Sequence, residues 1–349
     1  MLSSLKKYSF RKFRESETKI HELNYLFWEC TTRCNLNCLH CGSDCSKDSL
    51  HKDMPAHDFF QAIDTIKNIP QNFTVVFTGG EPLLRNDLEL CGKELRKRGF
   101  KWSIVSNGHL YNKERHISLL NAGIGALTIS LDGLKESHNW LRNNSHSFEK
   151  VINAIELASS SNRINFDIVT CVNQKNFNEL EQIRELLISK NVKAWRLFTI
   201  IPIGRAAHNS DLSLTDKQFV ELMDFITKHR KSKEIDIKFS CEGYVGKYEP
   251  HVRDSYFFCR AGINIGSILI DGSISACPNI DRSFIQGNIC TDNFYETWKS
   301  KFQPFRNREW TKTGQCETCT DYKDCKGNGF HNWHGEKKNV LVCHKEKIR

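Results

Sequence analysis

Five cysteines lie within sixteen residues near the N-terminus, in the segment CTTRCNLNCLHCGSDC at positions 30–45. Cys34, Cys38 and Cys41 are spaced C-x3-C-x2-C, and Cys30 and Cys45 flank them. Thiolates bind soft metal ions and iron–sulfur clusters. A structural zinc site usually takes four ligands from paired C-x2-C spacings, and this segment has only one such pair. The segment therefore predicts a metal or cluster site built on one short loop.

A second set of cysteines lies near the C-terminus. Cys259 and Cys277 come first, CETCTDYKDC at 316–325 contributes three more, and Cys343 follows. The spacing C-x2-C-x5-C with a later cysteine supplies four thiolates, which suit either a structural zinc site or a second iron–sulfur cluster. We therefore expect a ligand-stabilised unit in this part of the chain.

The segments between and around these motifs alternate between strand and helix patterns. Short apolar runs rich in β-branched and aromatic residues predict strands at 24–30, 73–80, 101–108, 125–133, 164–172 and 192–204. Helices are expected at 86–99, 112–122, 147–159, 177–190 and 215–228, and after Asp53, which is expected to cap a helix with an apolar face of Phe59, Phe60, Ile63 and Ile66. Because helical crossovers join these strands, they must form a parallel sheet of the α/β class, as a barrel or a doubly wound sheet.

Polar motifs follow several of the predicted strands. TGGEP at 78–82, SNG at 106–108 and SLDG at 130–133 each come where a strand ends, as the first cysteine segment does. Ligands of parallel α/β folds bind beyond the carboxyl ends of the strands. We therefore expect these motifs to form one site, although SNG and SLDG also suit ordinary turns.

The composition indicates a folded protein from a reducing compartment. Of the 349 residues, 39% are apolar and 26% are charged, which excludes a globally disordered chain. The fifteen cysteines are an odd number, and the first twenty residues contain no apolar leader, so a disulfide framework is disfavoured. We expect a cytoplasmic protein with no transmembrane segment.

The chain is basic, with a formal net charge of +9, and residues 1–20 hold six Lys or Arg and two acids. We expect this segment to be a solvated tail. The alternative is a docking site for an acidic peptide or an anionic membrane surface. No nucleic-acid partner is expected, because the sequence shows no nucleic-acid-binding module.

The triplet Cys34, Cys38 and Cys41, together with GGEP at 79–82, resembles the radical S-adenosylmethionine (SAM) superfamily. The resemblance covers 24–206 and implies a partial (β/α)6 barrel of the TIM type. It implies that the three cysteines bind three irons of a [4Fe–4S] cluster, whose fourth iron binds SAM. Reductive cleavage of SAM would then give a 5′-deoxyadenosyl radical, while the protein orients the reactants and excludes water.

The same resemblance implies a set of SAM-binding residues. One residue before the last cysteine is expected near adenine, and the GGEP glycines and acid near the SAM amino group. Residues of SNG and SLDG are expected near the ribose and the methionine portion, and the arginine of HNWLR at the SAM carboxylate. That arginine could instead be an ordinary surface charge. The residues are His40, Gly79, Gly80, Glu81, Asn107, Ser130, Asp132 and Arg142.

The C-terminal cysteines resemble the SPASM extension of radical SAM enzymes. This resemblance implies one auxiliary [4Fe–4S] cluster with the ligands Cys316, Cys319, Cys325 and Cys343. A first auxiliary cluster would use Cys259, Cys277 and a cysteine at a position where this chain has Gly329. One or two auxiliary clusters are therefore expected, because the first is either absent or completed by another residue. The candidates for that ligand are Cys241, Cys290, His331 and His334.

The expected domain boundaries follow from these motifs. They are a basic extension at 1–23, a radical SAM core at 24–206, a bridging region at 207–258 and a small cysteine-rich SPASM-like domain at 259–349. Cys30, Cys91 and Cys171 are most simply packed thiols.

The resemblance favours an enzyme that modifies a peptide or protein, with a flavodoxin or ferredoxin as reductant. HELNYLFWECTTRCNLNCLHCGSDC and HNWLR further resemble a subgroup encoded beside a small lipoprotein, which implies a lipoprotein precursor as substrate. One alternative is sulfatase maturation by formylglycine formation, although Gly329 departs from the full cysteine set of that group. Another is a non-catalytic iron–sulfur or zinc scaffold, which would not cleave SAM.

Overall fold

The computed structural model describes residues 2–49, 51–230, 232–240 and 242–348. Ten strands form one sheet in the order β10-β9-β8-β1-β2-β3-β4-β5-β6-β7. In this order, every pair of neighbouring strands from β8 through β1 and on to β7 is parallel. Strand β9 is antiparallel to both β8 and β10. The strands are β1 (Tyr25–Thr31), β2 (Thr74–Gly79), β3 (Lys101–Ser106), β4 (Ala126–Ser130), β5 (Asn165–Val172), β6 (Ala194–Thr199), β7 (Asp236–Phe239), β8 (Ile265–Ile268), β9 (Ser273–Ser275) and β10 (Gly287–Asn288).

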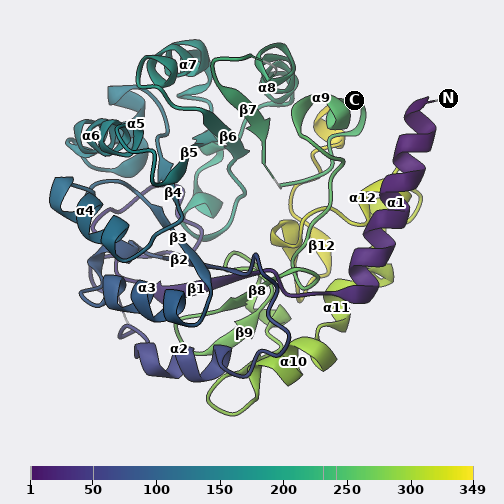
Figure 1. Cartoon of the computed structure of the whole chain (residues 1–349). Helices are drawn as coiled ribbons and strands as arrows, with labels where there is room; N and C mark the ends of the chain where they lie inside the picture. Colours follow the sequence, from purple (N-terminus) through teal and green to yellow (C-terminus); the bar gives the residue numbers. More distant parts are fainter. Residues whose placement is uncertain (1, 50, 231, 241, 349) are drawn as a thin grey trace.

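Helices surround the curved sheet, as Figure 1 shows. A short hairpin of β11 (Trp333–His334) and β12 (Asn339–Val340) belongs to the C-terminal region. The helices are α1 (Leu2–Ile20), α2 (Ala56–Ile63), α3 (Leu88–Lys97), α4 (Lys113–Asn121), α5 (Lys135–Arg142), α6 (Ser147–Ser159), α7 (Leu180–Ser189), α8 (Asp216–His229), α9 (Glu249–Val252), α10 (Phe294–Lys301), α11 (Gln303–Arg306) and α12 (Tyr322–Cys325).

The core lies between the sheet and the outer helices, and large aromatic side chains fill it. Trp28 of β1 stacks on Phe59 of α2, with ring centroids 4.0 Å apart and planes inclined by 5°. Phe77 of β2 meets Trp102 of β3 edge-on at 5.5 Å. Burial of each such side chain stabilises the fold by roughly 1.5–3 kcal/mol.

The α/β fold with a parallel sheet is confirmed, and the six predicted strands correspond to β1 to β6. The sheet has more strands than the sequence indicated. β7 extends it beyond β6, and β8, from the cysteine-rich C-terminal region, pairs with β1 over Tyr25–Trp28. The C-terminal region thus shares a sheet with the barrel core.

The expected role of Asp53 as a helix cap is wrong. Helix α2 begins after Pro55, which offers no side-chain cap. The carboxylate of Asp53 instead accepts hydrogen bonds from Thr31 Oγ1 at 2.6 Å and Arg33 Nε at 3.1 Å. Pairing with Arg33 turns the side chain toward the cysteine segment, and away from the helix.

The basic N-terminal segment is a helix that packs on the protein. α1 runs beside the C-terminal elements α11 and α12 (Figure 1), and Arg11 pairs with Asp324 at 2.9 Å. Its outer face leaves Leu5, Tyr8 and Phe13 exposed. Although α1 has 19 residues, no described helix combines the length and apolar character that a membrane span requires.

Candidate active site

The cysteine loop, residues 32–46, leaves β1 at the carboxyl edge of the sheet. Cys34 N–H donates to the Ser46 carbonyl at 2.8 Å and so closes the loop. Arg205, which lies beyond β6, donates Nε to the Cys38 carbonyl at 2.7 Å and its backbone N–H to the Cys41 carbonyl at 3.0 Å. Cys34 and Cys38 are buried and Cys41 is half-buried. The loop brings the three thiols together, since buried Cys34 and Cys38 belong to one packed cluster and Cys41 packs against it.

The flanking thiol Cys45 has a role that the sequence did not indicate. Its hydrogen bond to Cys41 lowers the pKa of Cys41 to about 6, and the same contact raises the pKa of Cys45. A hydrogen bond from a neighbouring thiol stabilises a thiolate, which is the form of cysteine that binds metal. Cys30, by contrast, is a fully buried thiol that donates to the Thr78 carbonyl at 3.5 Å, consistent with packing.

The glycines of TGGEP let the end of β2 press against the start of the cysteine loop. Gly80 N–H donates to the Thr31 carbonyl at 2.7 Å. A Cβ on Gly79 would lie 2.1 Å from the Thr31 carbonyl oxygen, and a Cβ on Gly80 would lie 2.1 Å from the Arg33 carbonyl oxygen. Gly79 also has φ +116°, which L side chains rarely adopt. No other residue fits either position without displacing the loop.

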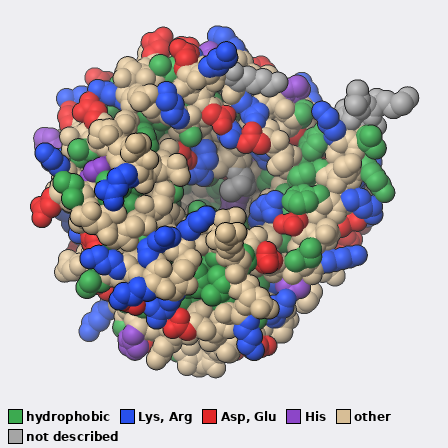
Figure 2. Space-filling view, in the orientation of Figure 1, with side chains coloured by type: hydrophobic (Ala, Val, Ile, Leu, Met, Phe, Trp, Pro, Cys, Tyr) green, Lys and Arg blue, Asp and Glu red, His purple; other side chains and the backbone are tan. Residues whose placement is uncertain are grey.

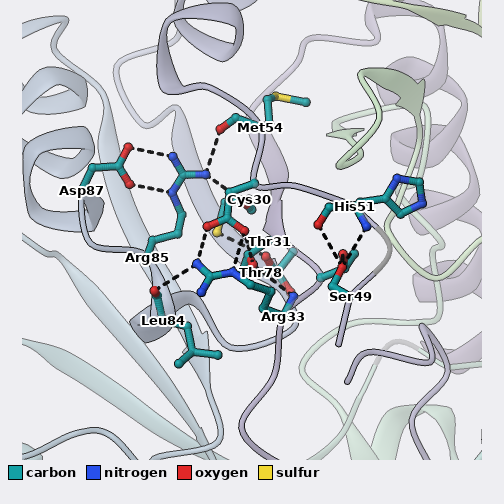
Figure 3. A network of polar contacts seen from close by, with 12 residues as sticks. Cys30, Thr31, Arg33, Ser49, His51, Met54, Thr78, Leu84, Arg85 and Asp87 are labelled. Atoms are coloured by element: carbon teal, nitrogen blue, oxygen red, sulfur yellow. Dashed lines mark hydrogen bonds and ion pairs between the residues drawn. The ribbon is translucent and has the colours of Figure 1, made fainter. Parts of the chain in front are cut away.

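Arg85 fixes the end of β1, from which the cysteine loop begins (Figure 3). Its guanidinium is buried, and Nη1 donates to the carbonyls of Cys30 at 2.7 Å and Met54 at 2.9 Å. The remaining nitrogens pair with Asp87 at 2.8–2.9 Å. This planar fork fixes the exit of β1, a use that suits arginine better than lysine.

Glu81 and the SNG turn form one buried unit. Glu81 is fully buried, Oε1 accepts from Ser106 Oγ at 2.9 Å, and Oε2 accepts from Asn107 N–H at 2.8 Å. Asn107 Nδ2 in turn donates to Cys34 Sγ at 3.8 Å. Burial raises the pKa of Glu81 although these hydrogen bonds lower it. The unit links the ends of β2 and β3 to the first cysteine.

Asp132 is the centre of a second buried group, on the other side of the loop. Its Oδ1 accepts from Cys171 N–H at 2.7 Å, and its Oδ2 lies 2.5 Å from Arg142 Nη2. Arg142 Nη1 also donates to Cys38 Sγ at 3.6 Å. Burial opposes ionisation of Asp132, but the charge of Arg142 keeps its pKa below the usual range.

His40 and Cys171 complete this group. The side-chain ligand atoms of His40, Asp132 and Cys171 lie within 4.8 Å of one another. Burial lowers the pKa of His40 to about 4, so its ring is neutral at pH 7. The sequence indicated Cys171 only as a packed thiol, because nothing in a strand pattern shows that it faces the ends of β4 and β5. Ser130, at the end of β4, is half-buried.

The surroundings of the loop fit a bound cofactor. Three buried polar atoms there have no hydrogen-bond partner among the described residues: Asn35 Nδ2, His40 Nδ1 and Arg142 Nε. Burying such groups unpaired is costly. Together with three adjacent thiols, these groups suit a thiolate-bound cluster with a polar organic ligand that offers acceptor atoms.

The second cysteine set also converges. The charges of Cys316, Cys319 and Cys343 act on Cys325, and burial raises the pKa of Cys325 to about 12. Cys325 Sγ accepts from Asn328 N–H at 3.2 Å, and Lys345 Nζ donates to Cys319 Sγ at 3.5 Å. The four thiols are therefore mutual neighbours, with nitrogen donors already placed on two sulfurs.

The first auxiliary set is less complete. Cys259 is buried and Cys277 is half-buried. A Cβ on Gly329 would lie 2.7 Å from the Glu242 carbonyl oxygen and from His331, so the close-packed backbone leaves no room for a cysteine there. Cys290 is exposed. Cys241, the other thiol considered for this cluster, lies outside the described residues.

A cleft of about 610 Å³ lies between the cysteine loop and the C-terminal region. The loop contributes Gly42, Ser43 and Asp44 to the lining, and the segment that follows β6 contributes Pro202 and Ile203. The C-terminal region contributes 278–282 together with His331, Trp333 and His334. Figure 2 shows the molecule hollowed at its centre, between the barrel and the C-terminal region.

Comparison with known proteins agrees with this arrangement. The radical SAM superfamily matches residues 28–187, and the SPASM iron–sulfur cluster-binding domain matches residues 259–320. The AdoMet-dependent heme synthase of Oleidesulfovibrio alaskensis is 26% identical over 323 residues, covering 87% of this chain and 82% of that protein. The mycofactocin maturase MftC of Mycolicibacterium smegmatis is 28% identical over 307 residues, covering 86% and 76%.

Solved structures show the same fold. SuiB of Streptococcus suis bound to S-adenosylmethionine has a TM-score of 0.68 at 15% identity, over 89% of this chain and 74% of that chain. The enzyme anSMEcpe with bound AdoMet and a peptide has a TM-score of 0.71 at 20% identity, over 92% of both chains. Two family domains in the expected order, on a matching fold, imply a [4Fe–4S] cluster with SAM and auxiliary iron–sulfur clusters. The chain is a member of the radical SAM superfamily that carries a C-terminal SPASM domain.

Proposed function

We propose that this radical SAM enzyme modifies a peptide or protein substrate in the cleft between the cysteine loop and the C-terminal region. In this proposal Cys34, Cys38 and Cys41 hold the cluster that binds SAM. The auxiliary cluster is held by Cys316, Cys319, Cys325 and Cys343. When bound, the first cluster and SAM supply the 5′-deoxyadenosyl radical.

The chain's own residues prepare this site. Arg205 holds the loop by its carbonyls, Arg85 holds the end of β1 by the Cys30 carbonyl, and Cys45 forms a hydrogen bond with Cys41. Glu81 fixes Asn107 against Cys34, and Asp132 orients Arg142 against Cys38. The assignments of His40, Gly79, Gly80, Glu81, Asn107, Ser130, Asp132 and Arg142 to SAM remain predictions, in which neutral His40 and the unpaired nitrogens meet its polar groups.

The charge of the cleft supports a peptide. Glu29, Asp44 and Asp281 line it; Asp44 pairs with Arg205 and the guanidinium of Arg282 pairs with Asp271, which leaves Glu29 and Asp281 without a Lys or Arg partner among the ion pairs of the described residues. A ligand with several carboxylates would meet repulsion there, while a peptide backbone is neutral. The volume of about 610 Å³ suits a few residues of a peptide, since ligand sites are commonly about 300–1,000 Å³. One protein of the same fold, SuiB, has been solved with its precursor peptide SuiA bound.

Haem synthesis is the second candidate. The AdoMet-dependent heme synthases among the relatives favour it, and His331 and His334 in the cleft are residues of a type that ligates porphyrin iron. The acidic lining argues against it, because porphyrin substrates carry several carboxylates.

The test compares the two substrates under identical conditions. Anaerobically reconstituted protein with SAM and dithionite is given either a synthetic peptide of the kind of small lipoprotein precursor that the resemblance implies or an iron porphyrin bearing carboxylates. We expect the peptide to increase 5′-deoxyadenosine formation and to acquire a new mass. Decarboxylation of the porphyrin without any change of the peptide would reject the proposal in favour of haem synthesis.

Substitution of the acidic lining sharpens the comparison. Asp281→Asn should raise the KM of a peptide that carries a Lys or Arg side chain, because it removes a negative charge that lines the cleft. Asp211→Asn, an exposed acid outside the cleft, is the matched control. If the two variants were indistinguishable with the peptide, the cleft would not be its binding site.

A further inference from the structure

Two guanidinium groups bind the backbone on both sides of Cys325. Arg14, from helix α1, donates to the carbonyl oxygens of the two residues that precede Cys325, at 2.6 Å each. Arg308 donates to the carbonyl oxygens one and three residues after Cys325, at 3.3 and 3.0 Å. Each arginine therefore fixes one side of the short segment that carries this thiol.

Neither guanidinium has a carboxylate partner among the ion pairs of the described residues. The nearest acid on the segment, Asp324, pairs with Arg11. Arg14 is only 8% exposed, and the face of Arg308 lies 4.4 Å from the Phe330 ring centroid. Burying a cation without a counter-charge is costly, so buried Arg14 needs an anionic group nearby, and half-buried Arg308 adds a second positive charge at the same place.

The cavity between α1 and the C-terminal region identifies that group. It has a volume of about 410 Å³, and Arg14, Arg308 and Cys325 all line it. Figure 1 shows α1 lying along α12, the helix that ends at Cys325. Two acids, Glu15 and Glu309, also line the cavity, but Glu15 pairs with Lys12 and Glu309 pairs with Lys326. The thiolates and the cluster they would bind are therefore the anionic group left for the two arginines.

We propose that Arg14 and Arg308 form a cationic clamp on the Cys325 segment, and that this clamp raises the reduction potential of the auxiliary cluster. The inference rests on the proposed ligand set of Cys316, Cys319, Cys325 and Cys343. A reduced cluster carries one more negative charge than an oxidised one, so nearby cations stabilise the reduced form. The N-terminal helix is thus a positioning element of a cluster whose ligands lie about three hundred residues away in the chain.

The experiment isolates the auxiliary signal. Protein carrying Cys34→Ala, Cys38→Ala and Cys41→Ala is reconstituted anaerobically, and its iron content and midpoint potential are measured by titration with EPR detection. The signal that Cys325→Ser abolishes belongs to the clamped cluster. If Cys325→Ser lost no iron, the ligand assignment itself would be rejected, whatever the substrate of the enzyme.

Arg14→Gln and Arg308→Gln should each shift the midpoint potential of that signal to more negative values. Arg14→Lys, which keeps the charge, should give a midpoint potential close to that of the native Arg14 protein. Arg98→Gln, which removes a surface cation paired with Asp64, should leave the potential unchanged. If Arg14→Gln fails to retain iron and Arg14→Lys recovers it, the clamp is also supported. Full iron content with an unshifted potential in Arg14→Gln would overturn the proposal.

Discussion

The ion pair between Asp132 and Arg142 gives the sharpest prediction for the apoprotein. The side chains are 1% and 10% exposed, with 2.5 Å between Oδ2 and Nη2. Asp132→Asn would leave the Arg142 cation buried without its partner. Losing one member of a buried pair costs about 3–5 kcal/mol. Because asparagine still offers an oxygen to Cys171 N–H, we expect the free energy of unfolding to fall by about 3 kcal/mol, the lower end of that range.

The assay is urea unfolding of the apoprotein under anaerobic, reducing conditions at pH 7. Asp64→Asn is the matched control, since Asp64 pairs with Arg98 but is 51% exposed. An exposed pair contributes about 0–1 kcal/mol. A loss for Asp132→Asn no larger than that for Asp64→Asn would refute the view that a buried charge pair organises this side of the loop.

The pH dependence of the same difference has a definite sign. The pKa of Asp132 is lower in the folded than in the unfolded protein, so its ionisation stabilises the fold fully above the unfolded pKa of about 3.9. That contribution is lost as the pH falls through the folded pKa. The stability difference between the native chain and Asp132→Asn should therefore shrink below about pH 4.

Three further predictions concern single residues. Burial raises the pKa of Glu242 to about 8. The free energy of unfolding should therefore fall by up to ~1.4 kcal/mol per pH unit between about pH 4.5 and 8. Glu242→Gln should abolish that slope in urea unfolding. Cys45→Ala should slow alkylation of Cys41 by iodoacetamide at pH 7, because it removes the hydrogen bond that lowers the pKa of Cys41 to about 6; equal rates would contradict this. Gly79→Ala should destabilise the apoprotein by more than Gly99→Ala. Both glycines have positive φ, but only at Gly79 would the added Cβ lie 2.1 Å from a carbonyl oxygen. Similar losses in the free energy of unfolding would show that the loop moves aside at little cost.

The sequence was sufficient for features that depend on local pattern. Strands β1 to β6 follow from runs of β-branched and aromatic residues, and the helical crossovers between them require a parallel sheet. The parallel sheet then places the cysteine loop, TGGEP, SNG and SLDG at one edge. This placement brings Glu81, Asn107 and Asp132 to that edge, whereas Arg142 and the expected SAM-binding roles came only from the resemblance to the radical SAM superfamily.

Other features depend on contacts between distant segments, which no local pattern encodes. Helix α1 is basic and polar, and its partner Asp324 lies 313 residues away, so its charge alone suggested a solvated tail. The strand β8 has only four residues and pairs with β1 across most of the chain. Arg205 and Cys171 reach the site from β6 and β5 without a motif of their own, and only the folded structure shows their neighbours.

The thiols of the first cysteine loop should support reductive cleavage of SAM. The most direct measurement is 5′-deoxyadenosine release from SAM under dithionite, in the reconstituted native chain and in Cys38→Ala, with Cys91→Ala as a control for loss of a buried thiol outside the site. We expect release by the native chain and by Cys91→Ala, and none by Cys38→Ala. Release by Cys38→Ala at the native rate would contradict it.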